Sequence, residues 1–354
     1  TVAMPVTKTL IRMEHKGVNI DEDLRSKRKE SLSNEMADLL ADDALCGINP
    51  NSPKQVLDHF KSKGVRLPIS RGRKTPSTDV HTLKLLRPRQ PKHHAFIDKC
   101  LAVRDRRKTI GTYLEAKVHK DGRMRTSYRT SATDTGRISS SKDVFNKGMN
   151  LQNVPGDQRD WFVPDPGLVF WEADGSQIEA RITAYVAGDV NYKQGFIEGR
   201  DIHSENAMAL FRIPASDVRN PVVGTHYTYR DIGKRASHAI NYMVGPGKLK
   251  DLMNEYVPDM KFSLNDARRF IDSFKTLRPG IHKWWINTIQ HLKTNRVMRT
   301  PYGRQRVFLD RWGDQLHRAA VAFVPQSTAA DHINAALARI ELRLESLPEA
   351  SVLL

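Results

Sequence analysis

A change from strand spacing to helix spacing around Asp174 constrains the fold more than any other feature of this sequence. The stretch from Leu168 to Asp174 is apolar, is typical of a strand and ends in a carboxylate. Apolar residues then recur at helical spacing from Ile178, and Gly188 offers a stop. A carboxylate between a strand and a helix sits on a rigid element and can face a cleft. Asp174 is therefore a candidate for metal-dependent phosphoryl transfer; the alternative is an ordinary cap for the helix that begins near Ser176.

The rest of the chain is mostly helical, with a few short β-prone stretches. Apolar periodicity predicts helices over 21–43, 53–63, most of 81–117, most of 189–297 and 319–344. Besides 168–174, the β-prone stretches are Met124–Tyr128 and Val307–Leu309. Residues 69–80 have the composition of a basic loop.

Positive charge narrows the class of partner. The 354 residues include 57 Lys plus Arg against 40 Asp plus Glu, a formal charge of +17. This charge is typical of a protein that binds a polyanion, and nucleic acid is the favoured partner, although a basic balance can also serve solubility alone. The basic residues gather in three clusters: Arg71–Lys74, Arg87–Lys92 and Arg104–Lys108.

Length, cysteines and hydropathy indicate a soluble protein of two or three domains in a reducing compartment. The two cysteines, Cys46 and Cys100, lie far apart and form no zinc motif. No apolar run reaches the roughly 18 residues of a membrane span, so we expect no membrane contact and a cytoplasmic location, in a prokaryote or a virus-infected host, with an organelle left open. Because the chain starts at Thr1 without a signal peptide, we expect a domain cut from a longer protein.

Four residues spaced four apart form a second chemical constellation. Arg230, Lys234, His238 and Tyr242 fall along one stripe of a helix, with two cations first and two rings after them. Such a stripe can hold a triphosphate through Arg and Lys while the rings meet a base or sugar. The alternative is a solvated charged face beside core aromatics.

Together with the motifs named below, these residues make the sequence resemble the family A DNA polymerases of the DNA polymerase I type over almost its full length. Asp174–Arg181 is similar to motif A of that family, and Arg230–Tyr242 is similar to motif B. The other landmarks follow the family's order: Thr135–Ser140 with Asn150–Pro155 as the duplex-binding segment, then Asp201–His203, Arg318 and Gln326–Asp331.

The resemblance implies an α+β fold with the right-hand architecture of polymerases: a helical thumb, an antiparallel β palm that is incomplete at the C-terminus, and helical fingers. It implies template-directed DNA synthesis from dNTP, with primer–template DNA as partner and two Mg²⁺ ions, or Mn²⁺ as a substitute. The expected domains are 1–120 for the thumb and N-terminal part, 121–188 for the first palm part, 189–298 for the fingers and 299–354 for the second palm part.

The resemblance also assigns roles to individual residues. It assigns metal binding to Asp174 and the carbonyl of Gly175. It makes Asp174, Lys234 and Arg230 the catalytic residues, of which Lys234 and Arg230 hold the triphosphate. Glu179 becomes the steric gate against a ribose 2′-hydroxyl. The nucleotide-binding residues are Gln177, Glu179, His203, Arg230, Lys234, His238 and Tyr242, and the DNA-binding residues are Arg137, Asn153, Arg318 and Gln326.

Departures from the family's pattern leave two alternatives open. Gly175 and His238 stand where the family usually has aromatic residues, and Met243 replaces a glycine. The chain as given stops before motif C, so we expect it to extend primers poorly unless a further domain or chain supplies that motif. A non-catalytic primer–template-binding fragment is one alternative. A single-subunit RNA polymerase is the other, and the gate at Glu179 argues against it.

Overall fold

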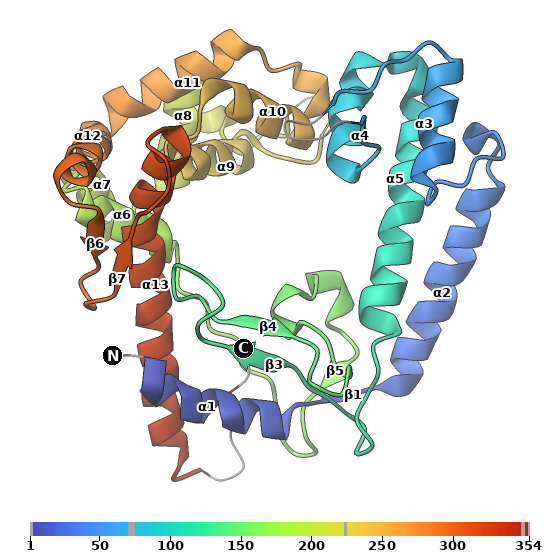
Figure 1. Cartoon of the computed structure of the whole chain (residues 1–354), viewed down its shortest axis with the longest axis horizontal. Coiled ribbons are helices and arrows are strands. Elements are labelled where there is room, and N and C mark those ends of the chain that lie inside the picture. The colour runs from blue at the N-terminus through green and yellow to red at the C-terminus, as the bar shows by residue number, and fades with distance from the viewer. Residues whose placement is uncertain (1–2, 70–74, 223–224, 348–350, 353–354) are drawn as a thin grey trace. The chain divides into compact units, whose positions relative to one another are not determined.

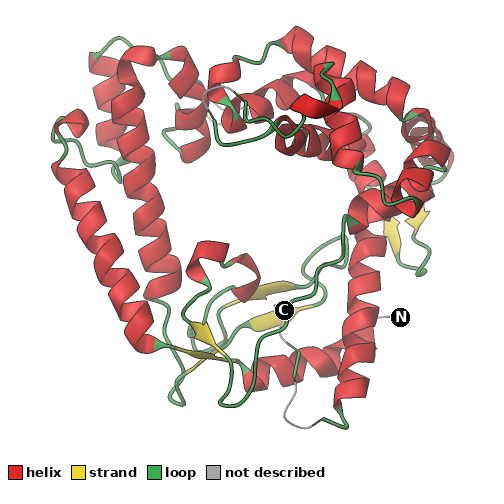
Figure 2. Ribbon diagram, turned by 180° about the vertical axis from the view of Figure 1, so that it is seen from behind, coloured by secondary structure: helices red, strands yellow, loops and turns green. Residues whose placement is uncertain are grey.

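The computed structural model describes residues 3–69, 75–222, 225–347 and 351–352, and its chain divides into two compact units (Figure 1). The smaller unit takes residues 13–128 and 140–171, and the larger unit takes 1–12, 129–139 and 172–352. The basic cluster Arg71–Lys74, expected as a loop, lies outside the described residues. Helices predominate and every strand is short, as Figure 2 shows.

Local sequence signals explain where the helices of the smaller unit begin and end. Asp21 caps α2, Glu22–Ala41, by accepting a hydrogen bond from Leu24 N at 2.8 Å. Ser52 caps the next long helix, which starts with Pro53 and is followed by Gly64 in the left-handed region. The elements up to the first sheet partner are α1 (Ala3–Lys16), which begins in the larger unit, β1 (Val18–Ile20), α2, η1 (Asp43–Leu45), α3 (Pro53–Ser62), α4 (Val80–Leu86), η2 (Arg87–Arg89), η3 (Pro91–His93), α5 (His94–Thr109), η4 (Ile110–Leu114) and β2 (Arg123–Met124).

A small antiparallel sheet and two apolar clusters hold the smaller unit together. The sheet has the order β2–β1–β5, with Val18 opposite Met124 and Ile20 opposite Phe162. Beside it, Trp161 is fully buried among Val18, Met124 and Tyr113. A second cluster, centred on Phe60, fills the space between α2, α3, α4 and α5. The remaining elements up to the end of this sheet are β3 (Ser127–Arg129), β4 (Ser139–Ser141), η5 (Leu151–Asn153), η6 (Gly156–Gln158) and β5 (Phe162–Val163).

The larger unit is a helical assembly with one β-hairpin. Its main core lies between α8, α9, α10, α11 and α12 and is rich in aromatic residues, among them Phe270, Phe274 and Trp285. In the hairpin, Val297 of β6 pairs with Val307 of β7. The elements are α6 (Ile178–Val186), α7 (Val190–Ile197), α8 (Ile202–Phe211), η7 (Ala215–Asp217), α9 (Tyr229–Asn241), α10 (Pro246–Tyr256), η8 (Pro258–Met260), α11 (Leu264–Leu277), α12 (Pro279–Thr294), β6 (Val297–Arg299), β7 (Gln305–Val307) and α13 (Asp314–Leu344).

The structure corrects three strand expectations. No strand forms over 168–174: Val169 and Trp171 are each 86 % exposed, and this described segment has no ladder partner. Apolar composition reports a tendency to be buried, but a strand also needs a second strand to bond with, so composition misled here. The stretch 124–128 is divided between β2 and β3, and β7 ends at Val307, two residues before the expected end. Among the described helices, none has both the length and the apolar composition to cross a bilayer.

One glycine in the smaller unit tests how tightly the backbone is packed. Gly148 has φ +74°, and a Cβ there would overlap the carbonyl oxygen of Arg125. Gly148→Ala should therefore lower the free energy of unfolding by about 1–2 kcal/mol through backbone strain and by about 1–3 kcal/mol more through the overlap. Gly122→Ala is the matched control, because Gly122 has φ +76° and open space around it. Equal losses for the two variants in urea unfolding would contradict this packing.

Candidate active site

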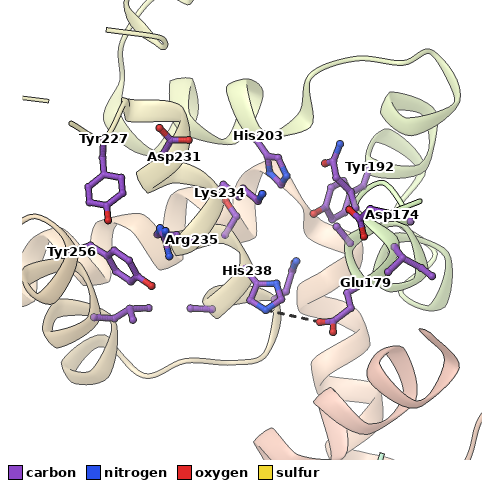
Figure 3. Close-up of a pocket in the computed structure, with 18 of the residues that line it drawn as sticks. Asp174, Glu179, Tyr192, His203, Tyr227, Asp231, Lys234, Arg235, His238 and Tyr256 are labelled. Carbon is purple, nitrogen blue, oxygen red and sulfur yellow. Dashed lines mark ion pairs between the residues drawn. The ribbon is translucent and has the colours of Figure 1, made fainter. Parts of the chain in front are cut away.

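A cavity of about 840 Å³ lies in the larger unit, bounded by α6, α8, α9 and α10 (Figure 3). Its volume is in the range of pockets that hold small-molecule substrates. Residues from five separate stretches of the sequence line its wall. Seven of the residues expected from the sequence are among them: Asp174, Gly175, Gln177, Glu179, His203, Lys234 and His238.

The carboxylate of Glu179, in the first turn of α6, is the most connected group of the cavity. It forms an ion pair with Arg137 and accepts a hydrogen bond from the hydroxyl of Tyr242 at 2.7 Å. The ring of His238 lies 3.9 Å from the same carboxylate (Figure 3). Four residues expected to bind nucleotide or DNA therefore meet at one point, although the sequence separates them by up to 105 positions.

Tyr242 caps the C-terminus of α9 rather than lying within the helix. Burial raises the pKa of its hydroxyl to about 12, against smaller opposing effects of Thr183, Arg137 and Gln326. The hydroxyl is therefore protonated at neutral pH and can donate to Glu179. Gln326 of α13 is thus placed beside Tyr242.

Lys234 and His203 both line the cavity, one with an exposed, charged ammonium and the other with a buried imidazole. Lys234 is exposed on α9, and within the described part of the chain its ammonium has no carboxylate partner. His203 is 8 % exposed, and neither of its ring nitrogens has a hydrogen-bond partner among the described residues. Burial, helped by the positive charges of Arg230 and Lys234, lowers the pKa of His203 to about 4. At neutral pH Lys234 thus offers the cavity a cation with no ion-pair partner among the described residues, and His203 offers an uncharged imidazole.

Arg230 lies outside the cavity wall, in a two-point ion pair with Asp201 at 2.8 and 3.0 Å. Asp201 also caps α8 through Ser204. Burial acts to raise the pKa of Asp201, but the hydrogen bonds from Arg230 and Ser204 outweigh it and hold the pKa well below its usual range. The two ends of the expected motif Asp201–His203 therefore act at different places. Asp201 orients Arg230, and His203 lines the cavity.

Asp174 provides one exposed carboxylate at the cavity edge, next to the carbonyl of Gly175. That carbonyl accepts a hydrogen bond from Ile178 N at 3.2 Å. Oxygen donors of these two kinds suit a hard cation such as Mg²⁺. However, no group of three or more His, Cys, Asp or Glu residues is placed to hold a metal in the described ranges. The described residues therefore fit one side of a cation site and do not complete a two-ion site.

The turn that carries Arg137 is held in place by residues of the hairpin and of α13. Gly136, with φ +75°, lies so close to Arg304 that a Cβ would overlap its guanidinium. Arg304 in turn forms an ion pair with Asp331, 2.7 Å at its shortest and with the carboxylate 3 % exposed. Asn334 donates to the carbonyl of Gly136 at 3.2 Å. The turn that presents Arg137 is thus fixed on two sides.

The other two residues expected to bind DNA, Arg318 and Asn153, are not among the residues that line the cavity. Arg318 is half-exposed on α13, with Asp314 3.7 Å away on the same helix. Asn153 belongs to the smaller unit, where its carbonyl accepts a hydrogen bond from the hydroxyl of Tyr113 at 3.0 Å.

An aromatic group at the end of the cavity away from Asp174 was not predicted from the sequence (Figure 3). The guanidinium of Arg235 stacks on Tyr256 at 3.7 Å and lies 5.5 Å from the ring of Tyr227. Arg235 follows Lys234 directly and could have been noted as a further cation. Tyr227 lies just before α9 and Tyr256 ends α10. Neither belongs to a periodic pattern from which a place in the cavity could have been predicted.

The neutral state of His203 predicts a pH dependence of stability. Between about pH 6.5 and 4 an unfolded histidine binds a proton that folded His203 does not, so the free energy of unfolding should fall as the pH drops through this window and be constant above it. His203→Gln should reduce the slope of that fall. The exposed His15→Gln serves as control, and an unchanged slope in His203→Gln, measured by urea unfolding at each pH, would contradict the assignment.

Comparison with known proteins identifies relatives of this chain. The sequence model of DNA polymerase family A matches residues 20–354. The thermostable DNA polymerase I of Thermus filiformis is 30 % identical over 98 % of this chain and 41 % of its own length. DNA polymerase I of Geobacillus stearothermophilus is 29 % identical over 96 % of this chain and 38 % of its own length.

A solved structure is similar to the whole chain. The POL domain of Pol1 from M. smegmatis, in complex with DNA primer–template and dNTP, has a TM-score of 0.80 and 27 % identity, covering 98 % of this chain and 60 % of that one. The α+β class and the right-hand polymerase fold expected from the motifs are confirmed. The chain spans about two fifths of the length of the curated relatives it matches. The match over residues 20–354 establishes that this chain belongs to DNA polymerase family A.

Proposed function

We propose that this chain carries the nucleotide- and DNA-binding centre of a DNA-directed DNA polymerase that transfers a nucleotide from dNTP to a primer 3′-hydroxyl. The observation that carries the proposal is the junction at Glu179, where Arg137, His238 and Tyr242 meet beside the cavity. Family membership and a neighbour solved with primer–template and dNTP support it. The four domains expected from the sequence, and a cytoplasmic location, stay predictions.

In this proposal the cavity receives the incoming nucleotide. Lys234, free of ion pairs within the described ranges, neutralises the triphosphate, and Arg230, already oriented by Asp201, adds its remaining donors. His203 is uncharged and offers a donor and an acceptor to a phosphate oxygen or the sugar. Gln177 and Glu179 lie at the sugar, where the fixed carboxylate of Glu179 leaves no room for a 2′-hydroxyl.

The same proposal places the DNA on the other side of the junction. Arg137 and Gln326 contact the minor groove at the primer end, with Arg318 and Asn153 on the flanking duplex. Arg137 is 52 % exposed, so donors of its guanidinium remain for DNA while it holds Glu179.

We include a divalent cation, Mg²⁺ or Mn²⁺, in the proposal, with this chain supplying only some of its ligands. Asp174 and the carbonyl of Gly175 would hold one side of it, and the cation would neutralise charge on the transferring phosphoryl group. Carboxylates for a second ion would come from a further domain or chain, because the described residues bring together no group of three or more His, Cys, Asp or Glu placed to hold a metal.

The single exposed carboxylate at the cavity edge, that of Asp174, favours a second candidate function: the chain by itself binds primer–template without extending it. Primer extension by this chain and by a version continued through its native downstream sequence distinguishes the two. Equal rates would show that this chain holds the catalytic carboxylates it needs. Binding without extension in this chain alone would support the second candidate.

The gate can be tested by shape and charge separately. Glu179→Ala should raise ribonucleotide incorporation relative to deoxynucleotide, because the side chain that excludes the 2′-hydroxyl is gone. Glu179→Gln keeps that shape and loses the charge, so it should stay selective. Single-turnover rates of both nucleotides in the extended, active protein measure this, with the exposed Glu198→Ala as control. Unchanged selectivity in Glu179→Ala would refute the gate.

Lys234→Ala should lower the efficiency of primer extension with dNTP, kcat/KM, by roughly ten- to a hundredfold, since a hydrogen bond to a charged group is worth about 1.5–3 kcal/mol. Primer–template affinity should stay near normal. Lys248→Ala, an exposed lysine of α10 outside the cavity, is the matched control. Nucleotide-dependent extension rates and fluorescence anisotropy with labelled DNA give the two quantities. If DNA affinity falls and nucleotide use does not, Lys234 belongs to the DNA cleft instead.

A further inference from the structure

A short turn of the smaller unit, residues 142–147, exposes two apolar side chains at its tip. Val144 is 90 % exposed and the neighbouring Phe145 is 77 % exposed. The turn follows β4 and precedes η5. Single exposed apolar residues are common on protein surfaces, but an adjacent valine and phenylalanine, both almost fully exposed, form an apolar tip that ordinary packing does not explain.

The tip is held by a well-built turn. The carboxylate of Asp143 accepts hydrogen bonds from Phe145 N at 2.9 Å and Lys147 N at 2.8 Å. Its other oxygen lies 2.7 Å from Nε2 of His119. Asp143 N donates to the carbonyl of Lys147 at 3.0 Å, and Asn146 takes the left-handed conformation that closes the turn. The exposure of Phe145 is therefore a property of a fixed loop.

The base of the turn is anchored in the core of the unit. Gly148 N donates to the carbonyl of Lys117 at 2.8 Å, and Met149 is 1 % exposed. Ser140, just before the turn, donates to the side chain of Asn150, just after it, at 2.6 Å. Ser140 and Asn150 belong to the two halves of the segment expected to bind the duplex, so the turn projects from the point where those halves meet.

The charges around the tip are positive. Lys142 and Lys147 flank the apolar pair, and the exposed Lys117 lies at its base. In the described portion of the chain none of these three ammonium groups has an ion-pair partner. The negative charge of Asp143 is taken up by backbone N–H groups and His119. The tip therefore offers an aromatic face between cations, a combination that suits nucleic acid, with its phosphates and stacking bases.

We propose that the 142–147 turn is an additional nucleic-acid contact, in which Phe145 lies against a base of the primer–template and Lys142 and Lys147 contact its phosphates. This inference rests on the proposed function for the identity of the nucleic acid. Because the backbone of the turn is already held by hydrogen bonds, binding through Phe145 costs little further backbone freedom, and stacking or wedging against a base is sequence-tolerant.

The test measures primer–template binding by anisotropy over a range of salt concentrations. Phe145→Ala should lower the affinity roughly five- to a hundredfold, the effect of losing one stacked base, and leave the salt slope unchanged. Lys142→Gln and Lys147→Gln should each reduce the slope of log affinity against log salt by about one. Leu342→Ala, an apolar residue 63 % exposed on α13, is the control.

Phe145→Trp adds a direct readout. It should keep the affinity, and the fluorescence of the added indole should be quenched by primer–template DNA beyond the quenching seen in the unsubstituted chain. Normal affinity of Phe145→Ala together with an unquenched indole would overturn the inference and leave the proposed function intact. If Phe145→Ala instead abolishes self-association in sedimentation and not DNA binding, the tip is a protein contact and the inference is wrong. An unsubstituted chain that binds no primer–template would refute the proposed function itself.

Discussion

The carboxylate of Glu179 is the group on which the arrangement of the cavity depends. It is only 18 % exposed and would be costly to place there without compensation. Arg137 supplies the opposite charge, and Tyr242 donates a hydrogen bond at 2.7 Å. Because burial keeps the tyrosine protonated, this hydrogen bond is present throughout the neutral pH range. One charge, fully satisfied, thus links the start of α6, the end of α9 and the turn at Gly136.

In the proposed function, this link makes nucleotide and DNA recognition depend on one another. Arg137, proposed to contact DNA, neutralises the residue proposed to select the sugar. A substitution of Arg137 would therefore leave Glu179 as an uncompensated carboxylate beside Tyr242, and would disturb both functions. The effects of substituting Arg137 and Glu179 should accordingly be non-additive, as expected for residues in one network.

Local patterns in the sequence predicted most of the helices, though not α1, and they failed where distant partners decide. The four-residue spacing put Lys234 and His238 on one face of a helix, and both line the cavity from α9, because helix geometry is set within a few residues. Arg230 and Tyr242, the other two residues of that spacing, lie outside the cavity wall. The stretch 168–174 was expected to be a strand and is not one, because a strand depends on another segment. Spacing also could not reveal that Asp201 engages Arg230, 29 positions away, since an ion pair of that kind is visible only after folding.

Helix α13 explains why the site keeps its shape although its residues come from distant segments. Gln326 lies beside Tyr242, Asp331 holds Arg304 against Gly136, and Asn334 binds the carbonyl of Gly136. These three residues lie within about two turns of one helix, so they keep fixed separations. A shift of α13 would therefore move the supports of Arg137 and Tyr242 together rather than separately. The junction at Glu179 is thus supported by a single rigid helix, as the proposed discrimination between sugars by a single hydroxyl requires.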